Sequence, residues 1–348
     1  MQTKEPTRQS NFELLRIVCM FAILCLHVLH HGCSKLALSS GADILSQAVH
    51  DALGFHVNAF LLISGYFGIR MRAKGFFRFF IPCAFYSALI WLVFALYYGE
   101  PLTVTGLLKR FHFFYRESPW WFVENYFFLF LTAPLINAAL ARSRQEVLLF
   151  LGLLAFLNIV CGGVLHSGFN SNGFNYNHFV FMYFTGGCIR RFDFSLSRNR
   201  CLLGYAVVTA LIFLESTFVH AIRDYINPLV VAQAVLVFLL FKTVRVQSAL
   251  VNSVAASVFS VYLMHDEDVY ARGALSSLVR RMGGVNWPFS TGYDFVFIVA
   301  MIGFSVAAFF ALIIADKILS RLFIDRLTGL ADYSYRKITD NIKKWVRL

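Results

Sequence analysis

Ionisable residues are concentrated in the first apolar segment of the chain, NFELLRIVCMFAILCLHVLHH. Glu13 and Arg16 lie near its start, His27 lies in its second half, and His30 and His31 close it. Arg16 and His27 are eleven residues apart, so in an α-helix they share one face, about 16 Å apart along the axis. Ionisable groups within a membrane helix are costly and are therefore candidates for function.

This face could bind an anion at one end and transfer a proton at the other. Arginine offers donors and positive charge to phosphates, and a histidine can act as a general base near neutral pH. Each residue also has a simpler interpretation: Arg16 as an interfacial anchor and His27 as a packing residue. A metal or haem site built on His27, His30 and His31 would need ligands from a second helix. No such set is evident, so we expect neither a metal nor a bound cofactor.

A second basic group follows the next apolar segment, in FLLISGYFGIRMRAKGFFR. Arg70 and Arg72, with Lys74 and Arg78 beyond them, could form a pocket for phosphates. They could equally do no more than fix the orientation of the neighbouring helices in the membrane. Arg70 and Arg72 are our candidates for donor binding, together with Arg16.

Two other polar pairs could support the chemistry. Glu124 and Asn125 lie just inside the apolar segment that begins PWWFVENYFF, where an unpaired acid is expensive. His265 and Asp266 end the segment SVYLMHDEDVY. The simpler interpretation of the second pair is that both are solvated loop residues near the outer surface. We retain Glu13, Glu124, Asn125 and His265 as possible supporting residues.

The composition places all of these residues in a membrane protein. The 348 residues are 58% hydrophobic and only 14% charged, whereas roughly a quarter of the residues of a soluble protein are charged. A membrane-spanning helix needs roughly 20 mostly apolar residues. About ten segments qualify: 11–31, 48–69, 76–98, 120–140, 146–166, 177–190, 201–220, 228–243, 250–265 and 292–316. We predict an all-α polytopic membrane protein with a single membrane-embedded domain over residues 1–348.

The distribution of charge predicts the orientation. With the N-terminus in the cytoplasm, most of the 31 lysines and arginines fall in the inner segments, as the positive-inside rule requires. The segments 32–50 and 266–291 then face outward, and residues 317–348 form a basic cytoplasmic tail along the inner membrane surface. This bias and the attraction of a basic tail to anionic lipids account for the net charge of +12. Nucleic acid is therefore not an expected partner.

Five of these segments resemble the membrane acyltransferase-3 family, in particular its branch that O-acylates bacterial surface polysaccharides. In the family's first helix an acid precedes an arginine by three residues and a histidine follows it by eleven, which maps to Glu13, Arg16 and His27. The other similar segments are FLLISGYFGIRMR, PWWFVENYFFLFLTAPLIN, NYNHFVFMYFTGGCIRRF and SVFSVYLMHDE. Many relatives carry two arginines three residues apart after the second helix, whereas Arg70 and Arg72 are two apart. Which of these basic residues binds the donor therefore stays open.

The resemblance implies a reaction and a location. The donor would be acetyl-coenzyme A, the acceptor a hydroxyl of a lipid-linked or cell-surface polysaccharide, and the location the bacterial plasma membrane, with both termini cytoplasmic. Arg16 and the basic turn would hold the coenzyme phosphates. His27 would be catalytic, either as the base that takes the hydroxyl proton or as a transient carrier of the acyl group. The alternative function is a transporter or exporter of surface polysaccharide that uses the same helices without acyl chemistry.

Overall fold

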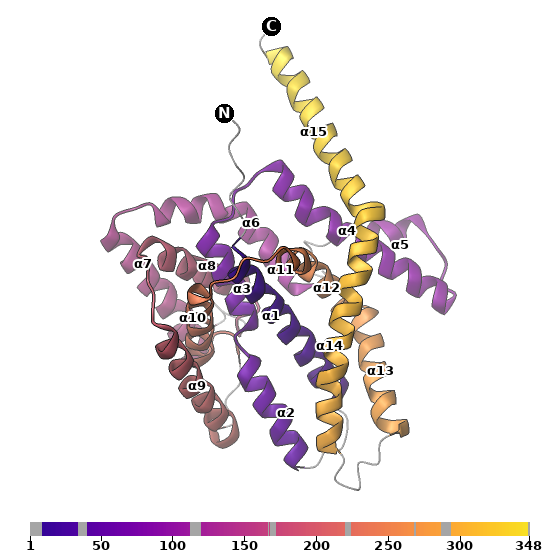
Figure 1. The fold of residues 1–348 in the computed structure, drawn as a ribbon. Coiled ribbons are helices and arrows are strands. Elements are labelled where there is room, and N and C mark those ends of the chain that lie inside the picture. The colour runs from indigo at the N-terminus through magenta and orange to yellow at the C-terminus, as the bar shows by residue number, and fades with distance from the viewer. Residues whose placement is uncertain are drawn as a thin grey trace.

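The chain folds into a bundle of helices. The computed structural model describes residues 9–33, 40–111, 120–165, 167, 172–219, 224–267, 269–286 and 294–346, and all regular secondary structure within these ranges is helical (Figure 1). Helices satisfy their own backbone hydrogen bonds, which is the requirement that lipid imposes on a spanning segment. The predicted all-α class is confirmed.

Six helical stretches among the described residues are long and apolar enough to cross a membrane. They are α1 (Ser10–His27) with the π-helical turn η1 (Val28–Cys33), α4 (Ala73–Tyr98), α6 (Trp121–Leu140), α7 (Arg144–Ala155) with η2 (Phe156–Val164), α9 (Arg198–Leu214) with η3 (Glu215–Val219), and α14 (Asp294–Leu319) with its continuation. These stretches coincide with six of the predicted spans.

The other four predicted spans are shorter or interrupted. The range 48–69 is split between α2 (Ser40–Leu53) and α3 (His56–Phe67), with a break at Gly54 and Phe55. The range 250–265 is split between α11 (Ala249–Ala255) and α12 (Val258–His265). The remaining two correspond to α8 (Tyr176–Arg191) and α10 (Pro228–Thr243). The count of about ten spans therefore stays a prediction.

Two segments that we expected to be outer loops contain helices. Residues 32–50 include most of α2, and residues 266–291 include α13 (Ala271–Asn286). α13 is too polar for a membrane span, but it buries Val279 and packs against η1. Amphipathic helices of this kind escape a search for long apolar runs. A further short helix, α5 (Val104–Lys109), lies between α4 and α6 in the chain.

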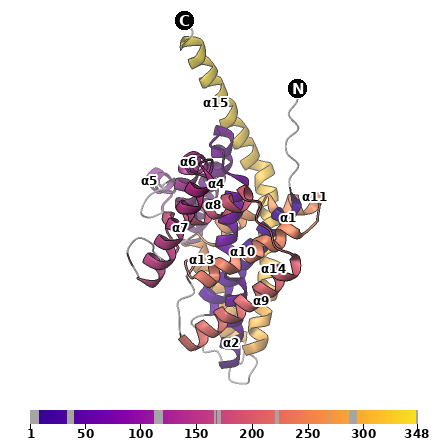
Figure 2. The same cartoon turned by 90° about the vertical axis from the view of Figure 1, so that its left-hand side faces the viewer.

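The basic tail is also helical. α14 continues through η5 (Ser320–Ile324) into α15 (Asp325–Val346), so the predicted tail of residues 317–348 begins within α14. α15 is exposed over most of its length and projects from the end of the bundle at which α1 begins (Figures 1 and 2). Its lower part packs against α4.

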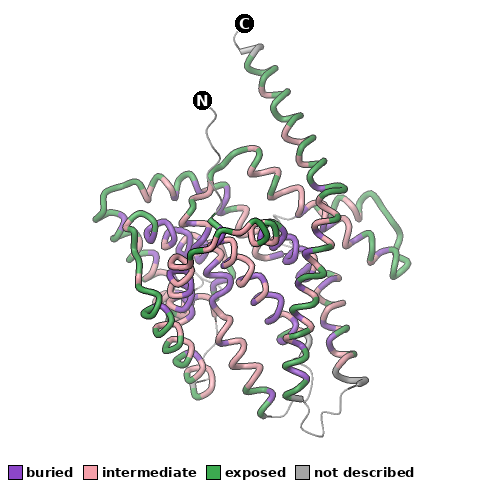
Figure 3. The backbone as a smooth tube through the Cα atoms, in the orientation of Figure 1, coloured by how far each residue is buried: buried purple, intermediate pink, exposed green. Residues whose placement is uncertain are grey.

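Helix α1 lies at the centre of the bundle. It packs against α2, α3, α10, α11, α12 and α14. Leu15, Cys19, Ala22 and Leu24 are fully buried within it, and Figure 3 shows buried residues along its length. Because neighbours surround α1 on most sides, a polar side chain on this helix must either find a protein partner or face an internal cavity.

Helices α3 and α8 meet at unusually close range. A Cβ atom added at Gly65 would lie 1.8 Å from the carbonyl oxygen of Tyr183, and one added at Gly186 would lie 2.3 Å from that of Leu62. Small residues allow such backbone contacts between membrane helices. Arg190 then caps α3, because its guanidinium donates to the carbonyl oxygens of Tyr66 and Phe67 at 3.1 Å each. α3 is therefore held firmly against α8.

Candidate active site

A cavity of about 460 Å³ lies between α1, α3, α4, α6 and α12. Arg16 and His27 both line it, so the face of α1 that they share is the face that meets the cavity. Arg78 also lines the cavity, as does His56. The wall between the basic and histidine ends is mainly apolar and aromatic, with Met20, Ile23, Phe60, Phe79, Phe122, Tyr126, Phe130 and Phe259.

The basic end is only partly enclosed. The Arg16 guanidinium donates to both carboxylate oxygens of Glu13, at 3.1 and 3.2 Å. Glu13 precedes Arg16 by three residues, so the two side chains meet on one helix face. The Arg16 side chain keeps 34% of its surface exposed, and Arg78 is exposed beside the cavity. Arg16 and Arg78 therefore bring two guanidinium groups to the cavity, and both keep contact with solvent.

The histidine end is fixed by hydrogen bonds between α1 and α12. The Nδ1 atom of His27 lies 3.0 Å from Nε2 of His265, and Nδ1 of His265 lies 2.6 Å from the carbonyl oxygen of Val261. A carbonyl oxygen only accepts, so Nδ1 of His265 carries the proton and its Nε2 accepts from His27. In a neutral His27 the proton is therefore on Nδ1. Its Nε2 keeps a free lone pair, which is the state of a general base.

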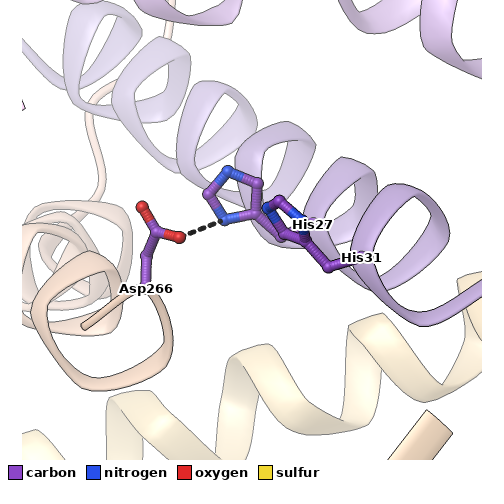
Figure 4. Close-up of side chains that lie close together, drawn as sticks. All are labelled: His27, His31 and Asp266. Atoms are coloured by element: carbon purple, nitrogen blue, oxygen red, sulfur yellow. Dashed lines mark ion pairs between the residues drawn. The ribbon is translucent and has the colours of Figure 1, made fainter. Parts of the chain in front are cut away.

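A buried carboxylate lies beside this pair of histidines. One oxygen of Asp266, Oδ1, is 3.3 Å from Nδ1 of His27 (Figure 4). The same oxygen is 2.8 Å from Nε of Arg272. The Asp266 side chain is only 2% exposed, so its charge depends on these partners for stabilisation. A positive charge formed on His27 would meet the carboxylate directly. Arg272, at the start of α13, holds the carboxylate in place.

The break between α11 and α12 helps to position these groups. Ala256 and Ser257 interrupt the helix, and α12 then packs against α1, α4 and α14. Val258 and Tyr262 are four residues apart and both line the cavity, while His265 lies three residues further on. One short helix therefore supplies both part of the cavity wall and the partner of His27.

Hydrogen bonds of the buried Asn58 hold the turn that contains Tyr225 against the histidine end of the cavity. The side-chain amide of Asn58 donates to the carbonyl oxygen of Tyr225 at 2.9 Å, and Nε2 of His178 lies 2.7 Å from Oδ1 of Asn58. Tyr225 lines the cavity and stacks on Trp121, with ring centroids 5.8 Å apart. Burial, with the carboxylates of Asp266 and Asp224, raises the pKa of Tyr225 above its ordinary value. Its phenol is therefore neutral at physiological pH and can donate a hydrogen bond.

The structure brings some of the predicted site residues together and leaves others apart. Arg16 and His27 line the same cavity, His265 contacts His27, and Glu13 orients Arg16. Arg70 and Arg72 are exposed in the turn before α4 and are not among the cavity-lining residues.

Glu124 and Asn125 also do not line the cavity. Both lie in the first turns of α6. The Asn125 amide donates to the carbonyl oxygens of Trp121 and Phe174, which is a structural role.

Three residues outside the list of candidates also lie at the cavity or beside His27: Arg78, Asp266 and Arg272. The sequence leaves Arg78 among the basic residues that could bind phosphates or only fix the topology, and it places Arg272 in the outward-facing segment 266–291. Its simpler interpretation of Asp266 is a solvated loop residue. The buried positions of His265 and Asp266, 5% and 1% exposed, overturn the loop interpretation. The run His265–Asp266 after an apolar segment was the available signal, because two adjacent ionisable residues there need partners.

Comparison with known families decides the classification. Residues 9–314 match the acyltransferase domain of the acyltransferase-3 family. The chain belongs to this family. Together with its long apolar helices, this match makes the chain a multi-pass membrane acyltransferase. Searches of curated proteins and of solved structures gave no significant match.

Proposed function

We propose that the protein is an O-acetyltransferase of the bacterial plasma membrane. It moves the acetyl group of cytoplasmic acetyl-coenzyme A to a hydroxyl of a lipid-linked or cell-surface polysaccharide. The observation that carries the proposal is that one cavity is lined by Arg16 at one end and by His27, about 16 Å along the same helix, at the other. An anionic donor and an uncharged hydroxyl need these two kinds of residue at opposite ends of one path.

The donor enters at the basic end. Arg16 and Arg78 bind its phosphates, since guanidinium groups make charge-assisted hydrogen bonds to phosphate oxygens. Its pantetheine arm then lies along the apolar wall, and the thioester reaches His27. The exposed Arg70 and Arg72 attract the donor from the cytoplasm as long-range charges.

Two chemical routes start from the same histidine. In the direct route, Nε2 of His27 takes the proton of the acceptor hydroxyl while its oxygen attacks the thioester carbonyl. The carbon–sulfur bond breaks, and the proton passes from His27 to the leaving thiolate. In the covalent route, Nε2 itself attacks the thioester carbonyl and the carbon–sulfur bond breaks, which releases the coenzyme thiolate. The acceptor hydroxyl then attacks the acetylated ring, the carbon–nitrogen bond breaks, and the hydroxyl proton ends on the thiolate. In both routes Asp266 stabilises the positive ring.

Purified protein with labelled acetyl-coenzyme A and a candidate glycan tests this function. We expect transfer of label to the glycan, and loss of the label on mild alkaline treatment, because the product is an ester. An exporter would move glycan across a vesicle membrane without transferring label. Glycan export without label transfer would replace the proposal with the transport alternative.

The proposed topology has about ten spans and both termini in the cytoplasm. It places the His27 end of the cavity toward the outside and the loop after α8 inside. Single cysteines in a cysteine-depleted variant, labelled from outside in intact cells, test this arrangement. A cysteine near residue 195 should stay unlabelled, and one at exposed residue 41 should be labelled; the reverse result would contradict the proposed orientation.

A further inference from the structure

One group of possible metal ligands overlaps the histidine end of the cavity. His27, His31 and Asp266 each offer a ligand atom, and these atoms all lie within 4.8 Å of one another. Asp266 lies just after α12, and the histidines lie on adjacent turns of α1 and η1 (Figure 4). No second ligand helix was evident from the sequence, because Asp266 is distant along the chain. Its approach to His27 supplies the missing ligand.

The second observation is an unused carboxylate oxygen. Oδ1 of Asp266 is bound by Arg272, but Oδ2 is buried and has no hydrogen-bond partner among the described residues. A buried carboxylate oxygen without a partner is costly and can be satisfied by a cation. Two imidazole nitrogens and one carboxylate oxygen form a ligand set that suits Zn²⁺, with a fourth position left for water.

The charges around the cluster predict weak, reversible binding. The Arg272 guanidinium lies 2.8 Å from Oδ1, so a divalent ion on Oδ2 would add positive charge close to an existing one. His31 is only half-buried and His30 beside it is exposed, so solvent reaches this side of the cluster. These features favour an ion that binds reversibly over a permanently bound structural metal.

We propose that His27, His31 and Asp266 form a reversible Zn²⁺ site, and that bound Zn²⁺ blocks acyl transfer. The blocking step rests on the proposed function, whereas the binding step does not. An ion on Nε2 of His27 occupies the lone pair that the reaction uses. An ion on Nδ1 leaves the proton of the neutral ring on Nε2, which then cannot act as a base. His31 has no part in the transfer, so it separates metal binding from catalysis.

The binding experiment uses the purified full-length protein in detergent and Zn²⁺ alone. Isothermal titration should detect one site, and His31→Gln should weaken its affinity about tenfold or more, because a ligand is lost. His30→Gln is the matched control, with the same change one residue away, and should retain the affinity within about threefold. His31→Cys, which replaces imidazole with a thiol that can bind Zn²⁺, should retain a site. No binding, or equal effects of His31→Gln and His30→Gln in folded protein, would overturn the proposal.

The activity experiment measures acetyl transfer at increasing Zn²⁺. Zn²⁺ should inhibit, a chelator should restore activity, and His31→Gln should keep its basal rate but need about tenfold more Zn²⁺ for half-inhibition. Equal sensitivity of wild type and His31→Gln would refute the blocking step. If no acyl transfer is found at all, the proposed function fails, and the titration alone still decides whether the metal site exists.

Discussion

The two ends of the cavity are built in opposite ways. At the basic end, Arg16 is held by one neighbour on its own helix, and the guanidinium groups stay in contact with solvent. At the histidine end, α1 with η1 meets α12 and α13, and hydrogen bonds between these elements fix both the ring and its tautomer. A charged donor needs attraction and some freedom on entry, whereas proton transfer needs a fixed geometry. Substitutions at the two ends should therefore affect different kinetic constants.

The largest expected effect is at His27. His27→Gln keeps a polar side chain but provides no base near neutral pH, so the rate of acyl transfer should fall about 10²–10⁴-fold. Donor affinity should be retained, because Arg16 lies about three helical turns away. The measurement is turnover of labelled acetyl-coenzyme A beside equilibrium binding of the donor. Near-normal turnover by a correctly inserted variant would leave His27 with a packing role only.

Asp266 should come next. Asp266→Asn removes the charge that faces His27 but keeps the shape of the side chain, and His265 still holds the tautomer. We therefore expect a fall in kcat of about 10²-fold, at the lower end of the range for general-base assistance. Donor KM should change little. If KM rises and kcat is unchanged, Asp266 acts on binding and the two ends of the cavity are not separate in function.

Arg16 should show the reverse pattern. Arg16→Ala should weaken donor binding about 10–100-fold, since hydrogen bonds to charged groups contribute about 1.5–3 kcal/mol. Once the donor is saturating, kcat should recover most of its value. Arg16→Lys should rescue binding only in part, because lysine lacks the planar fork of the guanidinium. If Arg16→Ala leaves donor affinity unchanged, Arg16 does not bind the donor.

The smallest effects distinguish the arginines around α4. Arg78→Ala should weaken donor binding about tenfold, because Arg78 lines the cavity. Arg70→Ala and Arg72→Ala should each change it by less than about threefold at physiological salt, because exposed charges are screened. They serve as matched controls on the same basic turn. If Arg70→Ala or Arg72→Ala lowers donor affinity more than Arg78→Ala does, the donor phosphates bind at the turn before α4 and not in the cavity.

The sequence was informative where the relevant residues share one helix. The spacing of Arg16 and His27 predicts a common face, and the structure opens a cavity along it. The charge cluster after the second segment was equally visible, but its members were not separable. Arg70 and Arg72 precede the start of α4 at Ala73, whereas Arg78 lies within the helix on the side that meets the cavity. Which of these arginines lines the cavity therefore depends on the residue at which α4 begins, and the charge pattern does not give that residue.

The partners of His27 could not be predicted, because they depend on contacts between distant segments. His265 is 238 residues away, and Asp266 is buried only because α12 and α13 pack beside α1 and η1. A search for long apolar runs also joined α2 to α3 and α11 to α12. Each break involves two residues, too few to change the hydropathy of a window of about 20.

The glycine contacts between α3 and α8 have a consequence for engineering. His56, Val57, Phe60 and Ser64 face the cavity from α3, while α3 and α8 touch backbone to backbone at Gly65 and Gly186, where no side chain lies between them. The backbone of this wall therefore has little room to shift when a cavity-facing side chain is trimmed. Shortening Phe60 should leave usable space and widen the range of acyl groups accepted. Redesign of donor selectivity is best begun on α3, because a change there alters the shape of the cavity and leaves the rest of the bundle in place.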